Sequence, residues 1–164
     1  MMPHDAPHVL SALEQSGLAA AIRQSVWAYP AANVGHIVAL TLFAGSVAIM
    51  DARLIGAFAA TPPANVVRPA RRVAVLGLLL MLLTGSVLFA AEAGHVGTNP
   101  VFQVKVALIV LGLSNAFLTG RAVQPLLDSI PPFAPLPRRV RLSALFSLGI
   151  WVCVAACGRL IAYF

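Results

Sequence analysis

Four apolar stretches constrain the fold more than any other feature of the sequence. They cover approximately residues 30–50, 73–91, 101–120 and 142–163. Each is close to the length of about 20 helical residues that crosses a hydrocarbon layer of about 30 Å. None shows the alternation of a membrane β-strand, and lipid offers no partner to an open strand edge. The sequence therefore predicts an all-α, integral membrane four-helix bundle.

The composition supports lipid as part of the solvent. Only 10% of the 164 residues are charged and 60% are hydrophobic, whereas soluble domains are about 25% charged. A chain of this length cannot bury so much apolar surface in one globular core. We expect a single four-span membrane domain over residues 1–164 that contacts the lipid bilayer directly.

Two segments outside the spans carry their own patterns. In residues 6–27, apolar side chains recur at helical spacing between polar ones, which predicts an amphipathic interfacial helix. Trp27 and Tyr29 then serve as interfacial anchors. No basic and apolar signal sequence precedes the first span, which is expected to act as its own insertion signal. Residues 122–137 contain five prolines and predict a semi-rigid extended linker.

The distribution of basic residues predicts orientation. Arginines gather between spans one and two and between spans three and four, while the second loop has none. Under the positive-inside rule the arginine-rich loops are cytoplasmic and both termini lie outside, in a bacterial cytoplasmic (inner) membrane. The net charge of +6 is then mainly a topology signal, and no nucleic acid partner is expected. The arginines are Arg53, Arg68, Arg71, Arg72, Arg121, Arg138, Arg139 and Arg141.

Ionisable residues inside the spans mark candidate functional positions. At about 1.5 Å per residue, His36 lies about 9 Å below Pro30 and Lys105 about 7 Å below Pro100, so the two share a depth near the outer surface. Glycines on the neighbouring helix faces allow close helix approach or leave room for a flat cofactor. We therefore predict a polar site in the outer leaflet. Its other predicted members are Asn33, Glu92, His95, Asn99, Asn115 and Arg159.

Several kinds of chemistry fit these residues. A neutral His36 imidazole can ligate haem iron, with His95 or Lys105 as the second axial ligand and Lys105 and Arg159 on the haem propionates. His36 with Cys153 and Cys157 offers ligand types suited to Cu(I).

Structural roles are open alternatives. Lys105 can snorkel to the headgroups, Glu92 can form an ion pair, and His36 can hydrogen-bond a neighbouring helix. Asp51 and Arg53 are interpreted as partners of the loop arginines. The sequence identifies no catalytic residue and leaves open whether the protein is an enzyme.

Several short motifs surround these positions: Trp27-Ala-Tyr-Pro30, Gly35-His36-Ile37, Asp51-Ala-Arg53-Leu-Ile-Gly56, Ala91-Glu92-Ala93 and Asn99-Pro100-x-Phe102-x-x-Lys105. They resemble the motifs of an uncharacterised bacterial inner-membrane family, similar to the domain of unknown function DUF6644. The resemblance covers about residues 6–121. Asn33 stands where that family usually has a glutamate.

The layout is more distantly similar to two other four-span groups. In the membrane protoporphyrinogen oxidase of the HemJ type, a first-span histidine and a lysine near the third span correspond to His36 and Lys105. That resemblance implies haem b and redox function, as electron transfer or as porphyrin or quinone chemistry. The histidine expected after the lysine is missing and falls near Asn115. Similarity to the copper-resistance D domain implies copper or small-solute handling instead. A non-catalytic membrane scaffold is the third hypothesis.

Overall fold

The computed structural model describes residues 7–163 and confirms the all-α, four-span architecture. Four of its helices are long and apolar enough to cross a membrane, and no strand occurs in the described range. The elements are α1 (His8–Glu14), α2 (Gly17–Gln24), α3 (Ala28–Ile55), α4 (Pro63–Ala91), α5 (Ala93–Thr98), α6 (Pro100–Val123), the 3₁₀ turn η1 (Gln124–Leu126) and α7 (Arg138–Leu160).

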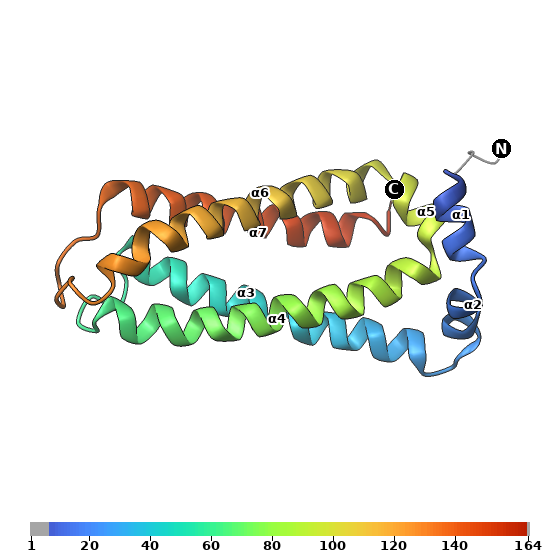
Figure 1. Cartoon of the computed structure of the whole chain (residues 1–164), viewed down its shortest axis with the longest axis horizontal. Helices are drawn as coiled ribbons and strands as arrows, with labels where there is room; N and C mark the ends of the chain where they lie inside the picture. The colour runs from blue at the N-terminus through green and yellow to red at the C-terminus, as the bar shows by residue number, and fades with distance from the viewer. Residues whose placement is uncertain (1–6, 164) are drawn as a thin grey trace.

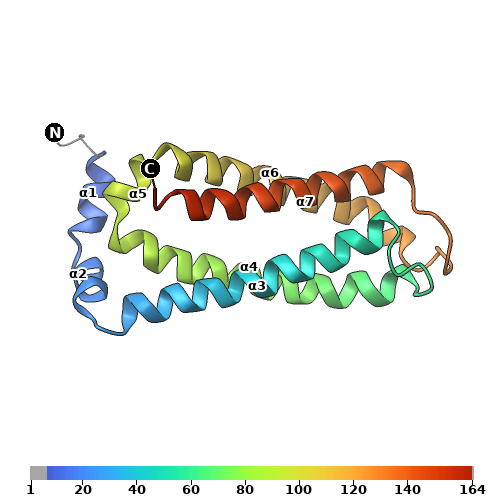
Figure 2. The ribbon, with the colours of Figure 1, turned by 180° about the vertical axis from the view of Figure 1, so that it is seen from behind.

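The long helices form two layers, α3 with α4 and α6 with α7 (Figures 1 and 2). The layers join where α3 packs against α7, whereas α4 and α6 do not pack against each other. The bundle is therefore open along one side, between α4 and α6. The short helices and the end of α7 lie at one end of the molecule (Figure 1), and we call the opposite end the arginine-rich end.

In the layer formed by α3 and α4, a glycine lets the two helices approach closely. A Cβ atom added to Gly77 would lie 2.8 Å from the backbone nitrogen of Phe43. Small residues at such crossings let helix backbones pack in contact. This agrees with the close approach expected from the glycines of span two.

Helix α4 begins ten residues before the predicted span. Pro63 occupies its first position, where the missing N–H of proline costs nothing. The arginines of its first turns do not break the helix, but they lower the mean hydropathy of that segment. The apolar pattern therefore indicates only the later part of α4. Asn99 starts α6 by accepting hydrogen bonds from the backbone N–H groups of Val101 (2.9 Å) and Phe102 (3.3 Å).

The predicted surface helix over residues 6–27 is wrong as a single helix. The chain breaks between α1 and α2, where the Ser16 hydroxyl accepts a hydrogen bond from Ala19 N (3.2 Å) and caps a new helix. The two helices lie across the end of the bundle (Figure 1). Glu14 accepts a hydrogen bond from Gly94 N (2.7 Å), and Arg23 donates one to Ala91 O (2.9 Å). Residue 6 lies outside the described range.

The prediction of an extended linker over residues 122–137 is also wrong. The segment completes α6, forms η1 and then folds back onto the arginine-rich end. Leu127 and Leu136 are buried in one apolar cluster with residues of α3, α4 and α7. Phe133 N donates a hydrogen bond to Ala59 O (2.8 Å), which joins the two loops. Burial of leucines between the prolines outweighs the preference of proline-rich chains for an extended form.

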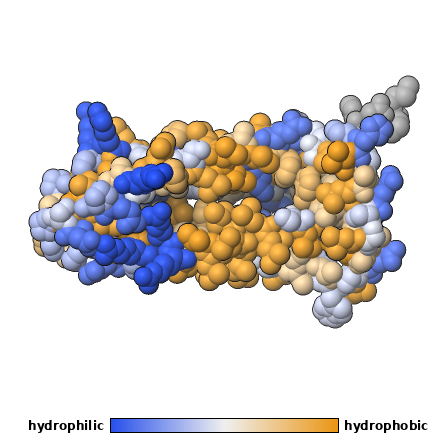
Figure 3. Space-filling model, viewed as in Figure 1, coloured by the Kyte–Doolittle hydropathy of each residue, from blue (hydrophilic) through white to orange (hydrophobic). Residues whose placement is uncertain are grey.

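The surface of the bundle matches a lipid environment. Apolar side chains form a broad band over the long helices, and hydrophilic residues gather at the arginine-rich end (Figure 3). Many large apolar residues are exposed, among them Leu79, Leu83, Phe117, Leu118 and Val152. An exposed apolar surface of this extent requires contact with the bilayer, so the chain is a multi-pass membrane protein.

Candidate functional site: a cavity at the open side of the bundle

His36 is held by α4. Its Nδ1 lies 2.9 Å from the Thr84 hydroxyl, and that hydroxyl donates its own proton to Leu80 O (2.7 Å). We therefore assign the imidazole proton to Nδ1, which leaves Nε2 as a hydrogen-bond acceptor or ligand atom. Gly85 makes room for the ring, since a Cβ there would lie 3.2 Å from His36 Cε1.

Lys105 lies in the same part of the interior. Its Nζ is 3.4 Å from the position of a Cβ on Gly158, so the side chain runs against α7 beside Cys157. Lys105 is close enough to act electrostatically on His36. The structure thus brings together the two residues that carried the predicted outer-leaflet site.

The remaining predicted members have other surroundings. Asn33, Glu92, His95 and Arg159 are all exposed. Glu92 accepts a 3.4 Å hydrogen bond from the Tyr29 hydroxyl, and Arg159 donates to the Tyr163 hydroxyl (3.0 Å). Asn99 is buried as the cap of α6 and leaves its own Nδ2 without a partner. Asn115 lies in the other half of the bundle.

The sulfur atoms do not join His36 in a metal-binding group. Cys153 is exposed and Cys157 is half-buried, and both are free thiols. Among residues 7–163, no three His, Cys, Asp or Glu side chains are placed to hold a metal ion. The ligand set suggested for copper is therefore not assembled in this part of the chain.

A cavity that the sequence did not indicate lies toward the arginine-rich end. It measures about 250 Å³ and is lined by residues of α3, α4, α6 and α7. Two of its lining residues, Val75 of α4 and Phe117 of α6, are exposed. Figure 3 shows the surface hollowed between the two layers. Phe43 and Trp151 form its aromatic wall, with their ring centroids 4.6 Å apart in an edge-to-face contact.

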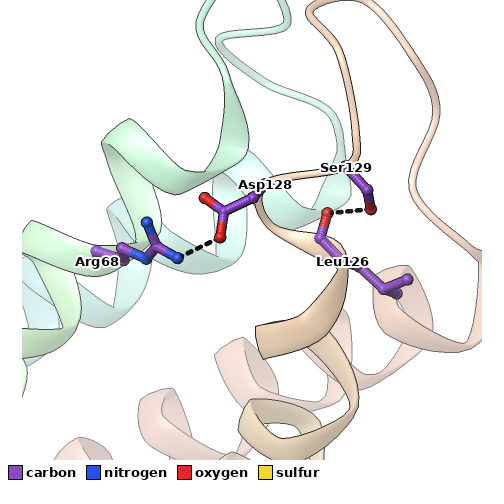
Figure 4. A network of polar contacts seen from close by, with 4 residues as sticks. All are labelled: Arg68, Leu126, Asp128 and Ser129. Carbon is purple, nitrogen blue, oxygen red and sulfur yellow. Dashed lines mark hydrogen bonds and ion pairs between the residues drawn. The ribbon is translucent and has the colours of Figure 1, made fainter.

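Asp51 brings a buried carboxyl oxygen without a partner to this cavity. Its side chain is only 3% exposed, and Oδ2 has no hydrogen-bond partner. Ser147 of α7, also buried, is a hydrogen-bonding neighbour of the carboxyl group. The interpretation that Asp51 pairs with loop arginines is wrong. In the described residues, the one ion pair joins Arg68 to Asp128 (Figure 4).

Arg53 does not pair with an acid either. Its side chain is 1% exposed and donates two hydrogen bonds, from Nε (3.1 Å) and Nη2 (2.9 Å), to Thr61 O. The guanidinium therefore fixes the turn between α3 and α4. Its role is structural.

Three other polar side chains of the cavity bond to one another. Asn115 Nδ2 donates to Ser143 O (3.1 Å), and the Ser143 hydroxyl donates to Asn115 Oδ1 (2.7 Å). Thr119 makes a hydroxyl contact with the same serine. These bonds hold α6 against α7 and leave Asp51 free to bind a ligand.

Arg71 of α4 completes the cavity wall. Its guanidinium reaches across the open side to α6, where a Cβ on Gly120 would lie 3.2 Å from one of its nitrogens. Among the described residues, Arg71 has no hydrogen-bond or ion-pair partner. A carboxyl group and a guanidinium thus line the same cavity without pairing.

One family model matches the chain, over residues 16–164, and its description is a family of unknown function, DUF6644. The chain belongs to this family. The match includes the last span, which lies beyond the region of residues 6–121 where the resemblance was expected. No curated protein and no solved structure matches the chain, and the distant similarity to protoporphyrinogen oxidase and copper-resistance proteins is not shown.

A sequence signal for the DUF6644 cavity does exist. Phe43, Val47 and Asp51 are spaced four apart on α3, and Ser143 and Ser147 are four apart on α7. Such spacing places each set on one helix face. A carboxylate that continues an apolar buried face is more consistent with an interior position than with a loop contact.

Proposed function

We propose that this membrane protein binds a small ring-bearing amphiphile of the bilayer, of the quinone class, in the cavity beside Asp51. The observation that carries the proposal is the buried carboxyl oxygen that lines the cavity without a hydrogen-bond partner. Leaving such an acceptor unpaired costs about 1–3 kcal/mol, and more when it is charged. A ligand that donates a hydrogen bond to Asp51 would offset that cost.

The size and lining of the cavity suit a single substituted ring. An apolar cavity of about 150 Å³ accepts benzene, and this one measures about 250 Å³. Its wall is mostly apolar with a few polar groups, as in other small-molecule sites. The Phe43 and Trp151 rings offer aromatic contacts to a flat ring.

Asp51 and Arg71 offer hydrogen-bonding groups that complement the oxygens of a quinol ring. The carboxylate of Asp51 accepts a hydrogen bond from a quinol hydroxyl, and Arg71 donates to a quinone or quinol oxygen. Ser147 supplies a further hydroxyl beside Asp51. An ordinary acyl chain has no group that would bind either Asp51 or Arg71.

The open side of the bundle supports access from lipid. Because α4 and α6 do not pack together, a ring can pass between them while its apolar tail stays in the bilayer. The ligand therefore need not cross an aqueous surface. This path distinguishes the proposal from a site for a water-soluble solute.

Fluorescence of Trp151 tests the proposal. The chain has two tryptophans, and Trp27→Phe leaves Trp151, at the cavity wall, as the sole reporter. Decylubiquinol, the reduced form whose hydroxyl can donate to Asp51, should quench it with saturation in the purified protein, and Asp51→Asn should weaken that binding about tenfold, as expected for loss of a charged hydrogen bond. Glu92→Gln is the matched carboxylate control and should bind normally. Unsaturable quenching, or equal binding by the Asp51 variant, would contradict the proposal.

A second candidate function is haem b binding at His36. It is favoured by the assigned Nδ1 proton, because a histidine ligand normally donates its other ring nitrogen to a fixed acceptor. The residues fit one axial ligand, with Lys105 as a cation for a propionate, and haem would supply one-electron chemistry when bound. A visible haem band in the purified protein that His36→Ala removes and His95→Ala retains would support it. Absence of the band, or its retention in both variants, would count against it.

A further inference from the structure

A second concave surface lies at the arginine-rich end, where α4 faces the end of α6. This arginine pocket has a volume of about 480 Å³. Arg68, Arg71 and Val75 are spaced three and four apart and therefore lie on one face of α4, with Arg72 next to Arg71 in the chain. The hydrophilic surface at this end is visible in Figure 3. The pocket is lined by Arg68, Arg71, Arg72, Val75 and Gln124.

The positive charge of the arginine pocket is mostly uncompensated. Arg68 donates a 2.6 Å hydrogen bond to Asp128, from the segment after η1 (Figure 4). Both side chains of this pair are substantially exposed, 46% and 67%, and exposed pairs contribute little. Arg71 and Arg72 have no recorded ion pair within the described range. Three like charges in one pocket with a single acid therefore favour an anionic ligand.

The position of the pocket along α4 corresponds to the boundary between the headgroups and the hydrocarbon of a bilayer. The helix has 29 residues, so its length of about 43 Å exceeds the hydrocarbon thickness by about 13 Å. If the excess is shared between the two ends, the boundary falls about 6–7 Å from Pro63. Arg68 lies at about that distance, and Arg72 is one turn deeper.

We propose that the arginine pocket binds the phosphate of an anionic phospholipid from the leaflet at this end, which the positive-inside rule predicts to be cytoplasmic. Guanidinium groups bind phosphate oxygens in a two-pronged geometry, and basic pockets between membrane helices on that side bind anionic headgroups. Val75 provides an apolar surface at the pocket for the start of an acyl chain. The proposal does not depend on a quinone in the cavity.

Native mass spectrometry of the full chain in detergent tests this site. Phosphatidylglycerol should be retained in preference to phosphatidylcholine with the same acyl chains. Arg68→Gln/Arg72→Gln should weaken phosphatidylglycerol binding about tenfold or more, since each basic residue near the membrane surface raises the affinity about fivefold. The matched control is Arg138→Gln/Arg139→Gln, which removes the same charge at the same end and should leave binding unchanged.

Other outcomes would overturn the proposal. Equal loss in both double variants would show a diffuse charge effect, and equal retention of phosphatidylcholine would show no headgroup preference. If inorganic phosphate competes as well as the lipid does, the site is one for free phosphate. Because neither substitution removes a residue of the Asp51 cavity, a failed quinone titration would leave this test valid. Melting curves of each variant confirm that it is folded.

The ion pair gives a second check on the same pocket. A lipid phosphate and Asp128 would compete for Arg68. Asp128→Asn should therefore strengthen phosphatidylglycerol binding by about two- to fivefold, the range expected for losing an exposed competing pair. Unchanged or weaker binding would contradict the placement of the phosphate on Arg68.

Discussion

Replacing Asp51 with leucine should stabilise the protein while it abolishes ligand binding. The carboxyl group is almost fully buried and leaves one oxygen unpaired, so the native residue carries an uncompensated desolvation cost. Leucine branches at the same carbon atom, and its larger side chain can extend into the cavity that Val47 and Leu54 also line. Residues retained for binding are often unfavourable for stability.

The magnitude follows from the unpaired oxygen. Removing a buried group without a partner recovers about 1–3 kcal/mol, and replacing buried polar groups by packed apolar ones is often stabilising by a similar amount. We therefore expect the free energy of unfolding of Asp51→Leu to rise by about 1–3 kcal/mol without ligand. With the quinol at one hundred times its dissociation constant, the native chain should gain about 2.7 kcal/mol and the variant nothing.

Reversible unfolding in mixed micelles measures both quantities. The native chain and Asp51→Leu are unfolded with increasing dodecyl sulfate, with and without decylubiquinol, and followed by helix content. Glu92→Gln should change stability by less than about 0.5 kcal/mol, as exposed substitutions do, and should keep the ligand effect. A loss of more than about 1 kcal/mol in ligand-free Asp51→Leu would refute the reasoning, because Asp51 would then be holding the helices together.

Three further predictions concern the frame around the cavity. Gly77→Ala should lower the free energy of unfolding by about 1–3 kcal/mol, because its Cβ would lie 2.8 Å from the backbone of α3. In the same assay Gly45→Ala, whose Cβ would have no neighbour within 4 Å, should leave that free energy unchanged or raise it by up to about 1 kcal/mol. Arg53→Met should lose about 1.5–3 kcal/mol with the two hydrogen bonds to Thr61 O, and an unchanged stability would contradict that role. A cysteine at Ser129, with both native cysteines replaced, should be labelled by a membrane-impermeant reagent only after the cells are opened. Labelling of intact cells would reverse the predicted orientation.

The four spans could be predicted because hydropathy and length are properties of each segment alone. The start of α4 could not, since arginines at a helix end lower the mean hydropathy without breaking the helix. Leu127 and Leu136 show a similar limit: composition identified a proline-rich linker, but its burial depends on contacts with three other helices.

The site was predictable only in part, for a related reason. Depth along each span predicted that His36 and Lys105 lie near each other, and the structure has Lys105 close enough to act electrostatically on His36. The glycines indicated close helix approach. The sequence did not show which helices pack side by side, so the gap between α4 and α6 was not foreseen. The predicted pairing of Asp51 with loop arginines relied on its position near the end of a helix. Its spacing from Phe43 and Val47 indicates a buried face instead.

Analysis of the small molecules that copurify with the chain tests the central claim most directly. The native protein and Asp51→Asn are purified in parallel from the same membranes in a mild detergent, and quinone is quantified against protein by mass spectrometry. We expect close to one molecule of quinone or quinol per native chain and strong depletion in the Asp51 variant. Glu92→Gln should match the native chain. Equal quinone in all three proteins, or none in the native one, would contradict this claim.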